Sequence, residues 1–133
     1  MSPQHLIAPD AAPPPPTARY SHAVKAGPFL YVTGQLPVDP DDPQAPLPDG
    51  IAAQTHMSFR NLGRIVDHAG YALADTVFAR IYLTQFERDY PEMNRVYGEY
   101  FPDERRLPGR TTVGVSALAR DALVEIDLVL WQS

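Results

Sequence analysis

An arginine and a glutamate stand on consecutive strand-like runs near the end of the chain, in LPGRTTVGVSALARDALVEI at residues 107–126. With a period of two, the face that begins at Arg110 continues through Thr112, Gly114 and Ser116. Glu125 shares its face of the second run with Leu123, Asp127, Val129 and Trp131. A guanidinium can hold a carboxylate through charge-assisted hydrogen bonds, and a glutamate can orient water or move a proton. The pair therefore suggests a site that binds a carboxylate and uses water.

Simpler interpretations exist for both residues. Glu125 could lie on a solvated sheet face, and Arg110 could form an ion pair at the surface or at a subunit interface. If the two runs form a hairpin that turns near Arg120, Glu125 lies opposite Val115 and Arg110 is roughly 16 Å farther along the strand. A β-bulge would change that register, and a neighbouring chain could instead complete the site.

Composition limits the classes of function. At 133 residues the chain is most simply one domain, which we divide into a Pro-rich arm at 1–18 and a single domain at 19–133. The net charge of −5 argues against nucleic acid as the main ligand. The chain has no signal-peptide pattern and no apolar run of ~18 residues, so we expect a cytoplasmic protein without membrane association.

Several site types lack a motif. There is no cysteine, which removes thiol nucleophiles and thiolate ligands, and the four histidines lack metal-ligand spacing. His22, two residues from Tyr20, is the histidine with a chance of lining a pocket. The phosphate-binding glycine motifs and the nucleophile elbow are also missing, so we expect no metal, no cofactor and no triad hydrolase.

Periodicity predicts an α+β fold. Residues 51–70 should form a helix with Thr55, Phe59, Leu62, Val66 and Ala69 on its apolar face. A second helix should begin with Asp89 as its cap and Pro91 in its first turn, and should end before Pro102. We predict strands at 20–25, 29–34 (a hairpin with the first), 76–84, 110–117 and 122–131.

The Pro-rich segments lie outside these elements. Residues 37–50 carry too many prolines for a central strand or a helix interior and should form a loop. Pro13 to Pro16 favour a polyproline II arm that is mobile or loosely docked. The helices should cover one face of a mainly antiparallel sheet, and the other face is rich enough in aromatic residues for self-association.

The same residues resemble a known family. RYSHAV (19–24), FLYVTGQLPVDP (29–40), the 54–70 helix, MNRVYGEYF (93–101) and PGRTTVGVSALARDALVEIDLVL (108–130) occur in the order typical of the Rid, or YjgF-like, reactive-intermediate deaminases. The resemblance covers the chain after about residue 18. It implies an α+β chorismate-mutase-like subunit of the bacillus type, with two helices on one sheet face. It also implies a homotrimer with sites between subunits.

The resemblance assigns roles to residues. Arg110 would grip the carboxylate of a 2-imino or 2-keto acid, and Glu125 would hold the water. The pocket residues that it implies are Tyr20, Thr33, Gly34, Asn94 and Thr112. The chain departs from the best-known branch at four positions, with Thr112 in place of cysteine, Thr33 in place of serine, and Ala119 and Arg19 in place of proline. These departures bear on substrate preference.

Three functions remain open from the sequence. The first is a 2-imino acid or enamine deaminase that hydrolyses C=N bonds of a small carboxylate substrate to 2-keto acids and ammonia. The second is a pathway-specific deaminase of a larger, aminomuconate-like unsaturated amino acid. The third is a non-catalytic trimer that binds a small carboxylate. An RNA-cleaving role has also been attached to this family, and the acidic balance argues against it despite Arg105, Arg106 and Arg110.

Overall fold

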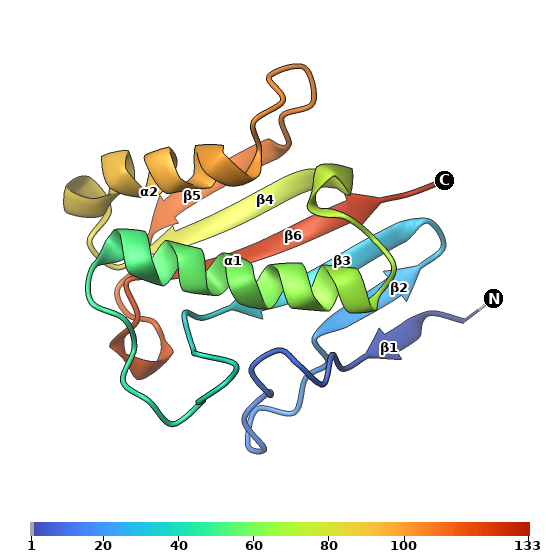
Figure 1. Ribbon diagram of the computed structural model, residues 1–133, viewed down its shortest axis with the longest axis horizontal. Helices are drawn as coiled ribbons and strands as arrows, with labels where there is room; N and C mark the ends of the chain where they lie inside the picture. The colour runs from blue at the N-terminus through green and yellow to red at the C-terminus, as the bar shows by residue number, and fades with distance from the viewer. Residues whose placement is uncertain (1) are drawn as a thin grey trace.

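A computed structural model describes residues 2–133. It contains β1 (Gln4–Leu6), β2 (Ala23–Ala26), β3 (Phe29–Gln35), α1 (Ile51–His68), β4 (Thr76–Leu83), α2 (Phe86–Tyr100), β5 (Gly109–Gly114) and β6 (Val124–Trp131). Short 3-10 turns lie at Leu73–Asp75 and Ala119–Asp121. The strands form one six-stranded sheet in the order β1-β2-β3-β6-β4-β5, and both helices cover the same face (Figure 1). The predicted α+β fold is confirmed.

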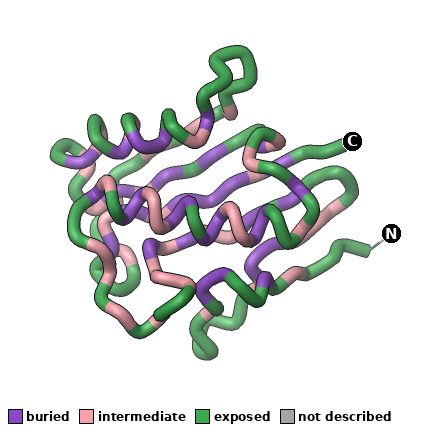
Figure 2. The backbone as a smooth tube through the Cα atoms, in the orientation of Figure 1, coloured by how far each residue is buried: buried purple, intermediate pink, exposed green. Residues whose placement is uncertain are grey.

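The core lies between that face and the helices. Phe59, Leu62 and Val66 of α1 are all at most 1% exposed, as the spacing of the apolar residues predicted. They meet alternate strand residues that are also buried, namely Leu30, Val32, Ala79, Ile81, Leu83, Val124, Ile126, Leu128 and Leu130. Figure 2 shows the buried backbone along the central strands and the inner sides of the helices. The apolar faces of the strands, which have a period of two, and of the helices, which have a period of 3.6, therefore pack together in one layer.

The second helix begins earlier than predicted. α2 starts at Phe86 with Gln85 as its cap, so Asp89 is inside the helix and Pro91 is not in the first turn. The Asp89 amide donates to the Gln85 carbonyl, and the Phe86 ring stacks on Tyr90 at 4.8 Å. This stacking favours the earlier start of the helix, and the prediction of Asp89 as the cap did not take it into account. The predicted helix end before Pro102 is confirmed.

The last two strands do not form the hairpin that the sequence left open as one arrangement. β5 pairs in parallel with β4, and β6 pairs antiparallel with β4 from the other side. The chain passes from β4 through α2 to β5, and such a helical crossover joins parallel neighbours. β6 then fills the place between β3 and β4.

The N-terminal arm is docked, which differs from the expected mobile or loosely docked arm. β1 pairs with β2, and Ala8 and Ala11 are almost fully buried. The Ala8 amide donates to His22 Nδ1 at 3.0 Å, and His22 Nε2 bonds to the Ala12 carbonyl at 2.8 Å. His22 is therefore an anchor for the arm instead of a pocket residue.

The second face of the sheet carries no helix and is rich in apolar side chains. Phe29, Tyr31, Phe78, Val113 and Trp131 are all more than one third exposed. Arg80 and Asp127 form an ion pair of 2.8 Å on this face. We call it the open face. Among residues 2–133, no helix is long and apolar enough to span a membrane.

Candidate functional site

Arg110 lies under α2. It pairs with Ala79, which is fully buried, so its side chain leaves the sheet on the helix side. Its Nη2 donates to Asn94 Oδ1 at 2.6 Å and to the Tyr90 hydroxyl at 3.3 Å, and its guanidinium carbon lies 4.8 Å from the Tyr97 ring centroid. Within residues 2–133, Nη1 and Nε have no hydrogen-bond partner. The guanidinium is therefore held in position with donors left for an anion.

Glu125 lies on the open face. It pairs with Tyr82, and its carboxylate packs against the backbone of Gly34 so closely that a Cβ at position 34 would overlap it. Gly34 belongs to the irregular stretch of β3 between Val32 and Gln35, where the register with β6 shifts. A glycine at this position leaves the room that the carboxylate occupies.

The surroundings of Glu125 change its acidity. Burial raises the pKa of Glu125 above its usual value, and the nearby Asp127 carboxylate raises it further. The pKa of Tyr20 is also raised, by burial first and then by the negative charge of Glu125. Asp127 itself is engaged by Arg80 and by the Tyr82 hydroxyl, 3.0 Å away. The surroundings of Glu125 thus favour its protonated form more than water would.

The structure separates the predicted site residues into two groups. Tyr20, Thr33 and Gly34 gather near Glu125, and the Thr33 hydroxyl donates to the Ser21 carbonyl at 2.7 Å. Asn94 and Thr112 accompany Arg110 on the helix side. The Thr112 hydroxyl is buried and has no partner among residues 2–133. Because the sheet lies between the groups, one chain does not bring Arg110 and Glu125 together.

Two further tyrosines belong to the Arg110 group. Tyr90 and Tyr97 flank Asn94 on α2 and place their rings beside the guanidinium. Neither tyrosine was predicted as a site residue. The spacing of Tyr90, Asn94 and Tyr97 along one side of a helix is the signal that could have found them.

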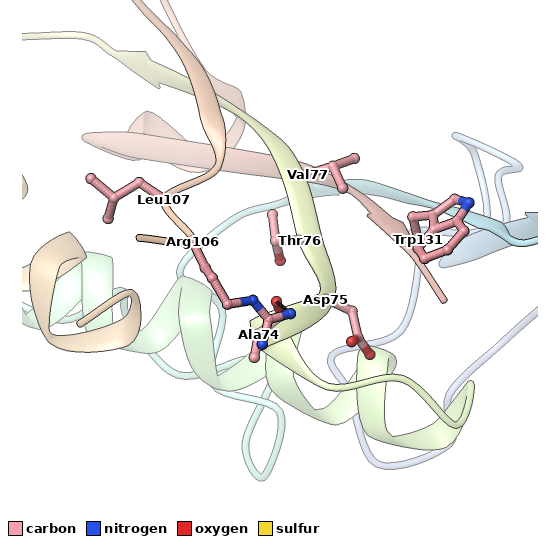
Figure 3. Close-up of a pocket in the computed structure, with 7 residues that line it drawn as sticks. All are labelled: Ala74, Asp75, Thr76, Val77, Arg106, Leu107 and Trp131. Atoms are coloured by element: carbon pink, nitrogen blue, oxygen red, sulfur yellow. Dashed lines mark hydrogen bonds between the residues drawn. The ribbon is translucent and has the colours of Figure 1, made fainter. Parts of the chain in front are cut away.

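The cavities differ in their relation to these groups. One, of about 380 Å³, is bordered by Tyr20, Gly34, Arg120 and the prolines Pro13 to Pro16. A second cavity, of about 300 Å³, lies between Arg106, Asp75 and Trp131, and its walls include none of the predicted site residues (Figure 3). Within residues 2–133, no cluster of three His, Cys, Asp or Glu side chains could hold a metal ion.

Comparisons with known proteins agree with this architecture. A family model described as endoribonuclease L-PSP matches residues 10–131. The chain is 41% identical to the 3-aminoacrylate deaminase RutC of Acinetobacter baylyi over 93% of this chain and 94% of that protein. The chain belongs to the Rid family. That family includes deaminases of imine and aminoacrylate intermediates, and other members carry endoribonuclease names.

Two more Rid relatives cover nearly the whole chain. A 2-iminobutanoate/2-iminopropanoate deaminase of Dermatophagoides farinae is 32% identical over 98% of each chain. The crystal structure of the Rid protein YyfA from Yersinia pestis superposes with a TM-score of 0.89, at 28% identity, over 98% of this chain and all of that one. The predicted fold and family are thus confirmed.

Proposed function

We propose that this Rid protein is a deaminase that hydrolyses 2-imino acids to 2-keto acids and ammonia. The observation that carries the proposal is the chemistry of the two groups: a guanidinium with unpartnered donors, and a half-buried carboxyl whose pKa is raised. The first suits the substrate carboxylate, and the second suits proton transfer to and from water. The names of the RutC and iminobutanoate deaminase relatives are consistent with this chemistry.

The reaction needs one water, and both protons of that water must reach the nitrogen. Water adds to the C=N carbon while Glu125, when ionised, takes its proton. The same carboxyl then delivers that proton to nitrogen, which gives a carbinolamine with a hydroxyl group and an amino group. Glu125 next takes the hydroxyl proton and passes it to the amino group, so the C–N bond breaks as the C=O bond forms, and ammonia leaves the 2-keto acid. Arg110 holds the substrate carboxylate throughout, which lowers the entropic part of the barrier. A carboxyl with a raised pKa is suited to both halves of this exchange.

We further propose that the complete site forms between subunits of a homotrimer. The Arg110 group and the Glu125 group lie on opposite sides of one sheet, so a small substrate that needs both must lie between two chains. The exposed apolar side chains of the open face, such as Tyr31, Phe78 and Trp131, supply a surface for that association. The active form would then be the cytoplasmic homotrimer, with no cofactor.

The test of the proposed activity is suppression of imine trapping. An amino acid oxidase generates 2-iminopropanoate from alanine, and semicarbazide traps the free imine. We expect the protein to reduce the amount of semicarbazide adduct and to increase pyruvate and ammonia. Unchanged trapping, with 2-oxobutanoate binding still detected by calorimetry, would instead support a small-carboxylate-binding module. Suppression with larger unsaturated amino acids alone would favour the pathway-specific deaminase.

A mixing experiment tests the shared site. Arg110→Ala chains keep Glu125, and Glu125→Gln chains keep Arg110, so heteromers of the two inactive variants contain some intact sites. Random assembly in a closed ring makes about one site in four intact, so co-expressed variants should recover roughly a quarter of the wild-type activity. Light scattering on the same sample should give the mass of three chains. If co-expression recovers no activity, each chain must build its site alone.

Gly34→Ala tests the fit between the β3 backbone and the Glu125 carboxylate. The added methyl group would overlap the end of a flexible side chain, so we expect the carboxylate to move. Imine hydrolysis should fall at least about tenfold, while the melting temperature stays within a few degrees. Gly63→Ala is the matched control because an added Cβ there has open space within helix α1. Full activity in Gly34→Ala would show that the carboxylate position is unimportant.

A further inference from the structure

The 380 Å³ cavity lies next to the Glu125 group, and the Glu125 carboxyl itself is not among the residues that line it. Gly34 and Tyr20 form one wall, and these two residues are the neighbours of the Glu125 carboxyl. The opposite walls come from the polyproline segment Pro13 to Pro16 and from Arg120. A molecule whose reacting carbon lies at Glu125 would enter this space by extending past Gly34 and Tyr20. We call this space the distal compartment.

The walls of the distal compartment are fixed by side-chain bonds. Asn61 of α1 accepts from the Ala12 amide at 2.8 Å and donates to the Val38 carbonyl at 2.7 Å. His22 holds the Ala12 carbonyl from the other side. Asn61 thus binds both Ala12, which precedes the proline run, and Val38, which lies in the Pro-rich loop. The backbone of the compartment at Ala12 and Val38 is therefore held in place before a ligand binds.

Arg120 is the one formally charged side chain among the residues that line this compartment. Its Nη1 donates to the Pro43 carbonyl and its Nη2 to the Ala45 carbonyl, both at 2.9 Å. Its backbone has a φ of 59°, which is uncommon for a residue other than glycine. These bonds fix the plane of the guanidinium and use two of its five N–H groups. The remaining donors have no partner within residues 2–133.

We propose that the distal compartment binds the second carboxylate of a dicarboxylic 2-imino acid and that Arg120 is its ligand. The inference rests on the proposed function, and it narrows the substrate class from 2-imino acids to those with an acidic side chain. Arg110 would hold the carboxylate beside the imine, and Arg120 would hold the one at the far end. Arg120 is exposed at this compartment, and its guanidinium, held by two carbonyls, favours an anion over an apolar end because its free donors can bond to a carboxylate.

The alternative is that Arg120 is only a clamp for the loop at Pro43 and Ala45. Both roles predict a loss of stability when the side chain is removed. They differ in substrate preference, because a clamp affects all substrates alike. Gln44 provides a second test, since it lines the compartment and its side chain makes no bond to Arg120. Gln44→Glu adds a negative charge beside the compartment and leaves both carbonyl acceptors in place.

The experiment compares two imines on the purified oligomer. Glutamate oxidase supplies 2-iminoglutarate and alanine oxidation supplies 2-iminopropanoate, and kcat/KM is measured for each. In the wild type, kcat/KM should be higher for 2-iminoglutarate than for 2-iminopropanoate. In Arg120→Gln and in Gln44→Glu that ratio should fall about tenfold or more, as expected for a lost charge-assisted bond. Arg105→Gln, at a 92% exposed side chain, is the matched control and should keep the wild-type ratio.

The outcomes separate this inference from the proposed function. An unchanged ratio in both variants would overturn the role of Arg120, even if both imines are hydrolysed. If the wild type hydrolyses neither imine, calorimetry with 2-oxoglutarate and 2-oxobutanoate replaces the rates. Selective binding of 2-oxoglutarate that is lost in Arg120→Gln would then support the compartment while the deaminase proposal fails. Equal affinity for the two keto acids would overturn the compartment.

Discussion

Arg110→Ala should lower kcat/KM for 2-iminopropanoate by about 10²–10³-fold, because two charge-assisted hydrogen bonds to the substrate carboxylate are lost. The loss should appear in both KM and kcat. A carboxylate that is no longer held binds more weakly, and it also leaves the C=N carbon free to move away from the water. Steady-state rates from the trapping assay, at several imine concentrations, measure the two contributions.

Arg110→Lys should recover little of this activity. The native guanidinium is held through Nη2 by Asn94 and Tyr90 while Nη1 and Nε remain for the substrate. A lysine has one nitrogen, so it cannot keep these contacts and present two donors in a plane. Arg106→Ala is the control, because that side chain bonds to the Ala74 carbonyl, away from both groups. Wild-type kcat/KM in Arg110→Lys would show that charge alone suffices.

The faces of the helices and of most strands were predictable from the sequence. The buried side of α1 and the alternating core residues of β4 and β6 follow directly from period 3.6 and period two. Burial also explains why these predictions succeed, since each pattern has one apolar side to cover. The pattern of β5 was misleading because Val113, on its more apolar side, faces the open face and is 41% exposed.

The arrangement of the site was not predictable in the same way. Period two says which residues share a face but not which strand lies alongside, so a hairpin of β5 and β6 stayed open until the sheet order showed β4 between them. Arg110 pairs with Ala79 and Glu125 with Tyr82, which point to opposite sides of β4. The estimated 16 Å between them assumed one shared face. The sequence predicted which residue types form the site. That Arg110 and Glu125 lie on opposite faces became clear only from the order of the strands in the sheet.

The docked arm was missed for a related reason. Its anchors are single polar side chains far away in sequence, His22 and Asn61, and no local pattern marks them. The proline run indicated an extended arm but not a partner surface. The arm also shapes the cavity beside the Glu125 group, because its prolines Pro13 to Pro16 line the distal compartment.

Glu125→Gln should lower kcat for imine hydrolysis by about 10²–10⁴-fold while changing KM much less, because the carboxyl moves protons and does not hold the substrate carboxylate. Wild-type activity should rise with pH through the pKa of Glu125, since the ionised form takes the proton from water. That rise should lie above the usual glutamate range, because burial and Asp127 raise the pKa. The residual rate of Glu125→Gln should lack this limb of the pH profile.

The stability of Glu125→Gln provides the control for misfolding. We expect this inactivating change to raise the stability of the fold, which is unusual. A pKa raised in the folded state means that folding disfavours the ionised carboxylate, so the wild type loses stability as pH rises through that pKa. Glutamine cannot ionise and avoids this loss. The variant should therefore melt at a higher temperature than the wild type at pH 8, and the difference should close at pH 4. A lower melting temperature at pH 8 would mean that the ionised carboxylate stabilises the fold, and the activity loss would then need a structural explanation.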